Sequence, residues 1–76
     1  MLNIFRRNKI TFLDNNWKIL KSNVRIPRIP RIYELVYITE KSKYYSVCNI
    51  IYNIKGRKCD SIFVIIEEYD DDDALI

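Results

Sequence analysis

The only glycine of the chain, Gly56, lies in the polar stretch Lys55–Lys58, between two runs that are rich in β-branched and aromatic residues. Glycine supplies the positive φ that a tight hairpin turn needs. We therefore predict an antiparallel hairpin in which Tyr44–Ile54 pairs with Ser61–Tyr69, centred between Gly56 and Arg57. The rest of the chain has to be arranged around this hairpin.

The predicted register gives the hairpin two apolar faces. With this centre, the numbers of paired residues add to 113. One face carries Val47 with Ile66, Asn49 with Val64, and Ile51 with Ile62; the other carries Tyr44 with Tyr69, Cys48 with Ile65, Ile50 with Phe63, Tyr52 with Ser61, and Ile54 with Cys59. An antiparallel sheet normally turns one polar face to water. We therefore expect the rest of the chain or another molecule to cover the second face. The candidate apolar interface is Val47, Ile51, Ile62, Val64 and Ile66.

Two further segments, Trp17–Ile26 and Tyr33–Thr39, are rich in β-forming residues, and we predict that both are strands. Turn-forming residues bracket them, since Asp14–Asn16 precedes the first and Glu40–Lys43 follows the second. These segments supply the remaining strands of a sheet built on the hairpin.

The first 13 residues, Met1–Leu13, form an N-terminal lid or arm whose apolar residues fit either a short helix or a strand. We expect residues 1–69 to be a single, mainly β domain. Its fold is a small antiparallel barrel or curled sheet of four to five strands. Residues 70–76 form an acidic C-terminal tail.

Charge divides the chain into a basic body and an acidic end. Residues 1–66 contain all 13 lysines and arginines and only four acidic residues, a net charge of +9, whereas the chain from residue 67 onward carries −6. Such an uneven charge distribution creates long-range electrostatic fields that act on binding partners, and it says little about the fold.

The basic body contains a short repeat, Arg25-Ile26-Pro27-Arg28-Ile29-Pro30-Arg31-Ile32. Each proline fixes its own φ and keeps the preceding residue extended. The repeat predicts a polyproline-II-like segment on which Arg25, Arg28 and Arg31 point the same way, at intervals of about 9 Å. Since these like charges repel one another, we expect an acidic group beside this candidate interaction or phosphate-binding ridge.

The acidic tail is a candidate partner for this ridge, in the same chain or in a neighbouring copy. The candidate docking residues are Glu67, Glu68, Asp70, Asp71, Asp72, Asp73, Leu75 and Ile76. Asp70–Ile76 resembles the C-terminal tip of bacterial and phage single-strand DNA-binding proteins, although the Pro-Phe ending of that family is missing. The resemblance implies a tip that docks onto partner proteins and competes with DNA for the basic fold.

Residues typical of catalysis are scarce. The chain has no histidine, which is the commonest general base and metal ligand. A single glycine cannot build a phosphate-binding loop. Cys48 and Cys59 lack the spacing of a zinc site and are expected to be reduced thiols. We expect no catalytic activity, no metal, no cofactor and no small-molecule substrate.

The longest uninterrupted apolar run, Ile62–Ile66, falls far short of the roughly 20 residues that span a bilayer. Met1–Leu13 has neither the long apolar core nor the cleavage site of a secretory signal. We expect no membrane partner and a location in the cytoplasm, or in the virion if a phage encodes the protein.

The stretch Ile29–Tyr69 resembles short SH3-like β-barrel proteins of phages and Bacteroidetes. The similar positions are Ile29–Ile32, Glu34–Val36, Tyr44–Val47, Asn49–Ile51 and Ile62–Glu68. Tyr33 stands where such sequences often have glycine at a tight turn. The resemblance implies a small SH3-like barrel and no particular activity.

Two functions fit these features. The first is a non-catalytic protein–protein interaction module, a small accessory or structural (virion-associated) protein of a phage or mobile element. It would bind a protein partner, or itself, through the second apolar face. The second is a small barrel that binds single-stranded nucleic acid, with basic residues on phosphates, tyrosines stacked on bases, and the acidic tail as regulator.

Overall fold

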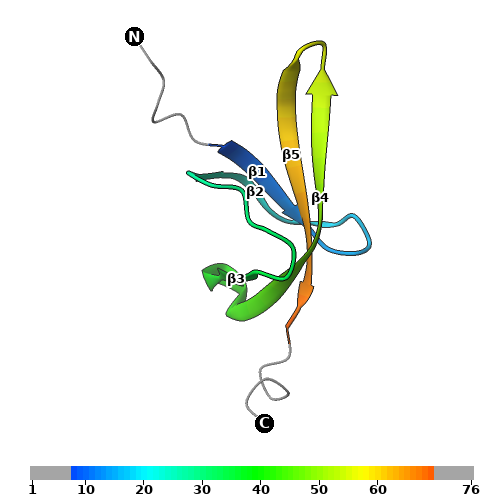
Figure 1. Cartoon of the computed structure of the whole chain (residues 1–76). Helices are drawn as coiled ribbons and strands as arrows, with labels where there is room; N and C mark the ends of the chain where they lie inside the picture. Colours follow the sequence, from blue (N-terminus) through cyan, green and yellow to red (C-terminus); the bar gives the residue numbers. More distant parts are fainter. Residues whose placement is uncertain (1–7, 70–76) are drawn as a thin grey trace.

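The computed structural model describes residues 8–69, which form five strands and one turn of 3₁₀ helix (Figure 1). The elements are β1 (Asn8–Leu13), β2 (Ile19–Ile26), β3 (Leu35–Ile38), η1 (Thr39–Lys41), β4 (Lys43–Lys55) and β5 (Lys58–Glu68). The four strands predicted outside the N-terminal segment are confirmed, and the mainly β fold is confirmed with them.

The strands form one sheet in the order β2-β1-β5-β4-β3. β1 runs parallel to β5, and every other neighbouring pair is antiparallel. The prediction of an antiparallel sheet is therefore wrong at one place. No short turn links β1 to β5, so packing alone sets their relative direction: the parallel register aligns Ile10 with Ile62 and Phe12 with Val64, and all four side chains are buried.

β1 is a central strand rather than a lid, because it lies between β2 and β5. The predicted turn that follows β1 is confirmed. Asp14 holds it, since its Oδ1 accepts hydrogen bonds from the backbone N–H groups of Asn16 (2.8 Å) and Lys18 (2.9 Å). Of the two alternatives for the N-terminal segment, residues 8–13 form a strand. The alternatives for residues 1–7 lie outside the described residues.

The sheet curls into a half-barrel around one core (Figure 1). Eight core side chains of the described region are at most 6% exposed: Ile10, Phe12, Ile38, Tyr45, Val47, Ile62, Val64 and Ile66. The ladder between β1 and β2 has two register shifts, and β2 contains Asn23 with a φ of 57°. Bulges of this kind bend a strand and increase its twist.

The β4–β5 hairpin follows the predicted register at both ends but not in the middle. Val47 lies opposite Ile66 and Ile54 opposite Cys59, as predicted. Between them, two register shifts leave Cys48 as an extra residue in β4 and Asp60 as an extra residue in β5.

The first of these bulges changes which side chains share a face. Ile50 now lies opposite Val64 and Tyr52 opposite Ile62, whereas Ile51 lies opposite Phe63. The predicted pairs in this stretch, including Ile51 with Ile62, are therefore wrong by one residue. A shift of one residue exchanges the two faces of a strand, so Ile50 packs against the core and Ile51 belongs to the outer face.

The hairpin tip and the turn before β3 are among the turns of the described chain that contain a residue with a positive φ. Gly56 has a φ of 64° at the hairpin tip, as predicted. In the turn before β3, the N–H of Glu34 donates to the carbonyl of Arg31 (3.0 Å), and Tyr33 has a φ of 75°. The tight turn therefore forms with a tyrosine at a position that favours glycine.

Candidate functional site

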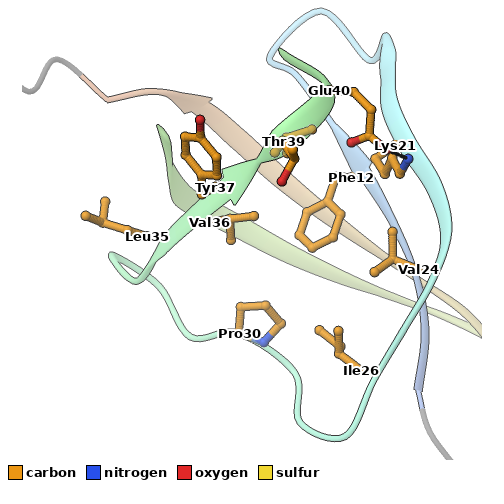
Figure 2. A pocket seen from close by; sticks show the side chains of 11 residues that line it. Phe12, Lys21, Val24, Ile26, Pro30, Leu35, Val36, Tyr37, Thr39 and Glu40 are labelled. Carbon is orange, nitrogen blue, oxygen red and sulfur yellow. Dashed lines mark hydrogen bonds and ion pairs between the residues drawn. The ribbon is translucent and has the colours of Figure 1, made fainter. Parts of the chain in front are cut away.

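The half-barrel is open along one side, between its two edge strands, β2 and β3. We call this gap the seam. A groove of about 360 Å³ runs along it. In Figure 2, the Phe12 ring lies at the centre of the groove, and Val24 from β2 and Val36 from β3 approach it from opposite walls. Ile26 and Pro30 line one end. The walls are therefore largely apolar, and they are the parts of the core that the incomplete sheet leaves uncovered.

An ion pair crosses the seam at its other end. Lys21 of β2 and Glu40 of η1 bind each other through Nζ and Oε2, and both side chains are exposed. The hydrogen bond from Lys21 holds the pKa of Glu40 below its usual value. An exposed ion pair of this kind contributes only about 0–1 kcal/mol. It links β2 to η1, the turn that follows β3, across strands that do not pair with each other.

Both strands that border the seam have a free backbone edge within the described sheet. β2 pairs only with β1, and β3 pairs only with β4. A free strand edge carries N–H and C=O groups that can pair with another extended chain. The seam thus combines an apolar floor with hydrogen-bonding groups on both sides.

Exposed hydrophobic side chains gather beside β3. They are Ile32, Tyr33, Leu35, Tyr37 and Tyr44. Tyr37 and Tyr44 lie opposite each other on β3 and β4, with ring centroids 4.7 Å apart and planes tilted by 55°. Leu35 lies at the margin of the groove, away from the Phe12 ring (Figure 2), and alternates with Val36 along β3. An extended chain added to β3 would therefore meet apolar side chains on both of its faces.

Four of the five side chains predicted as an apolar interface lie in the core. Val47, Ile62, Val64 and Ile66 are among the core residues of the half-barrel. The fifth, Ile51, is half-buried on the outer face opposite Phe63. The structure therefore does not bring these five residues together on one accessible surface.

The three arginines of the repeat do not form a straight ridge. Arg25 belongs to β2, the chain bends at Pro27 and Arg28, and Arg31 begins the turn before β3. The bend breaks the predicted polyproline-II-like geometry. All three side chains are exposed.

The acidic group beside this segment is Glu34. Its Oε1 accepts from the backbone N–H of Arg31 (2.7 Å), and its Oε2 accepts from Nη2 of Arg28 (3.2 Å). Both hydrogen bonds lower the pKa of Glu34 below its usual value, and the bond from the Arg31 backbone has the larger effect. Glu34 therefore stabilises the loop between β2 and β3, which runs along the seam.

The predicted docking tail is described only at its beginning. Glu67 and Glu68 end β5. Glu68 accepts a hydrogen bond from Nζ of Lys43 (2.9 Å), which raises the pKa of that lysine, and Glu67 accepts one from Asn15 (3.4 Å). Asp70, Asp71, Asp72, Asp73, Leu75 and Ile76 lie outside the described residues.

Both cysteines are free thiols. Burial raises the pKa of Cys48, the bulge residue of β4, above its usual value, and the Glu67 carboxylate adds to the effect. Within residues 8–69, no three side chains of the metal-binding types gather at one place. The same residues contain no helix with the length and apolarity to cross a bilayer.

The groove residues Phe12, Val24 and Val36 were not singled out by the sequence. Each reads as an ordinary apolar position of a strand, and nothing local marks β2 and β3 as the two edges. In the comparisons with known proteins, no family model matches the chain, and no curated protein or solved structure is significantly similar to it.

Proposed function

We propose that this chain is a non-catalytic protein-interaction module whose seam binds an extended segment of a partner protein. One observation carries the proposal: an apolar groove of about 360 Å³ lies between two strands that each keep a free edge. Addition of a strand to an exposed sheet edge is a common mode of peptide recognition, in which main-chain hydrogen bonds supply affinity and side-chain pockets supply specificity.

The occupant is an extended segment that is not already part of a sheet. A strand placed between β2 and β3 needs both of its own edges free. Each described strand of this chain is already paired on at least one edge. A second copy could therefore add to β2 or to β3, but its sheet strands could not fill the seam.

The walls of the groove define the chemistry of that segment. Successive side chains of a strand point to opposite faces. The inward ones would contact Phe12, Val24 and Val36 and should be aliphatic or aromatic. The outward ones would lie beside Leu35 and Tyr37 on the exposed side of β3. We expect a short segment with few prolines and with apolar residues at every second position.

A displayed library of random peptides, each of about ten residues, tests this proposal. The library is selected against the protein, and the peptides recovered are measured against two variants by fluorescence anisotropy. Val36→Trp fills the groove and should weaken binding at least tenfold, since it removes the space that the inward side chains need. Ile54→Trp adds the same ring at an exposed position on the far end of the hairpin and should leave binding unchanged.

Three outcomes would overturn the proposal. They are failure to recover any peptide class, recovered peptides without an alternating apolar pattern, and equal effects of the two variants. Thermal unfolding of both variants verifies that they fold. The same titration on a 1–69 truncation shows whether the tail is the natural occupant, because its removal would then tighten peptide binding. The assignment to a phage or mobile element stays a prediction.

A further inference from the structure

The tip of the β4–β5 hairpin extends beyond the rest of the sheet (Figure 1). β1 pairs with β5 only from Ile62 to Ile65, and β3 pairs with β4 only from Lys43 to Ser46. The hairpin from Asn53 to Ser61 is therefore a two-stranded ribbon, which we call the arm. It shares no residue with the seam.

The arm carries three exposed cations within four residues, Lys55, Arg57 and Lys58. Lys55 lies directly opposite Lys58 in the ladder. Like charges at opposite positions destabilise a pair of strands. The acid of the arm, Asp60, accepts a hydrogen bond from Asn53 (3.5 Å), and the ion pairs found among the described residues engage other cations. The folding of the hairpin therefore gives no reason for this cluster.

A second pair of cations lies at the base of the arm. Lys9 of β1 is directly opposite Arg25 of β2, and both are exposed. The parallel register of Ile10 with Ile62 places Lys9 next to Ser61, where the arm begins. This is another like-charge pair that opposes pairing of the strands that carry it.

The two pairs share the outer face of the sheet. Ile10 points into the core, so its neighbour Lys9 points outward, and the same alternation places Ser61 and Asn53 outward. Two residues beyond Asn53, Lys55 is again outward, with Lys58 opposite it. Because Asp60 is a bulge, Lys55 lies only two ladder positions beyond Asn53, so the two pairs lie roughly 7 Å apart along the strands. We call Lys9, Arg25, Lys55, Arg57 and Lys58 the cationic face.

We propose that this cationic face binds the phosphate backbone of double-stranded nucleic acid, independently of base sequence. Duplex is favoured over single strands because of its higher charge density, one negative charge per about 1.7 Å of axis. Single-strand binding depends instead on aromatic platforms. Tyr45 lies in the core, Tyr37 and Tyr44 contact each other, and the strand alternation puts Tyr52 on the opposite face of the arm. Tyr33 is exposed, but it belongs to the turn before β3 and not to the arm.

A membrane surface fits this face less well. Interfacial binding combines cations with aromatic and aliphatic side chains that enter the headgroup layer. The exposed apolar residues of the arm, Tyr52 and Ile54, alternate with Asn53 and Lys55 and therefore lie on the face away from the cations. The proposal does not depend on the seam, so Val36→Trp should leave nucleic-acid binding unchanged.

The test is a titration of a labelled duplex of about 20 base pairs, with a single strand of the same length, over salt concentrations from about 50 to 200 mM. Two triple variants, each losing three positive charges, are compared with the parent chain. One is K55Q/R57Q/K58Q on the arm. The matched control is K18Q/R31Q/K41Q, which changes exposed cations elsewhere. Circular dichroism verifies that both variants fold.

Five phosphate contacts predict a slope of about −4.5 for the logarithm of the association constant against the logarithm of salt concentration. The arm variant should reduce the size of that slope by about 2.7 and weaken binding at least tenfold at low salt. The control should keep the parent slope and bind within about twofold of the parent.

The proposal is overturned if the duplex does not bind at low salt, if the single strand binds more tightly, or if both triple variants lose affinity equally. The last result would indicate a diffuse field of positive charge. Vesicles containing anionic phosphatidylserine provide a further comparison. Binding of these vesicles through the arm cations, without binding of the duplex, would assign the face to membranes instead.

Discussion

At the scale of single residues, Tyr33 and Trp17 are the two aromatic residues of the described chain with a positive φ, and Tyr33 is the more exposed. Its backbone is left-handed, with a φ of 75°, and its side chain is 85% exposed. A bulky residue with positive φ is an outlier that costs about 1–2 kcal/mol. Its side chain contributes little burial that could offset this cost. Tyr33 therefore carries a backbone strain that its own burial does not offset.

Tyr33→Gly should raise the free energy of unfolding by about 0.5–1 kcal/mol, because glycine adopts a positive φ without steric cost. The greater conformational entropy of glycine in the unfolded chain cancels only part of this stabilisation. The same change should weaken the binding of peptides selected on the seam. Urea denaturation measures the first effect. The control, Tyr37→Gly, lies within β3, where glycine weakens the strand, and should destabilise the protein. A loss of stability in Tyr33→Gly would contradict the argument.

At the scale of elements, Glu34 controls the loop between β2 and β3 through its hydrogen bonds with Arg31 and Arg28. Its pKa is lower in the folded protein than the ordinary value of 4.5. The carboxylate therefore contributes its full stabilisation above pH 4.5, and this contribution is lost as the pH falls through the lower pKa of the folded state. Acid should loosen the loop at one end of the seam.

NMR chemical shifts of residues 27–34, followed from neutral pH to below pH 4.5, measure this loosening. The shifts should move with a midpoint below the ordinary pKa of a glutamate. Glu34→Gln should remove the transition, since its amide does not titrate. Glu67→Gln, whose side chain lies next to Asn15, should leave it in place. A transition that persists in Glu34→Gln would show that another group holds the loop.

The strands were predictable because their signals are local. Runs of β-branched and aromatic residues and the single glycine located four of the five, with each boundary within three residues of the observed one. The bulges at Cys48 and Asp60 were not predictable, because the curvature of the sheet decides where a ladder slips. The first bulge moved only Ile51 to the other face. The other four predicted interface residues still share one face, and that face is the one the half-barrel encloses.

At the scale of the whole molecule, the seam exists because β1 is inserted between β2 and β5. That arrangement leaves β2 and β3 as the edges of a sheet too short to close on itself. The sequence of β1 fits a helix or a strand, and its parallel partner lies far along the chain. Nothing in the local pattern could therefore specify the sheet order or the groove that depends on it. The apolar excess of the chain led to the prediction of a fold completed by another molecule, and this stays a prediction.

Hydrogen exchange of the backbone amides, with and without a selected peptide, tests the open seam most directly. A strand seated between the two edges should slow exchange in β2 and in β3 together, because it forms hydrogen bonds with both. Exchange in the central part of β5, which is flanked by β1 and β4, should not change. Slower exchange on only one of the two edges, or only on the outer face of the sheet, would contradict the account.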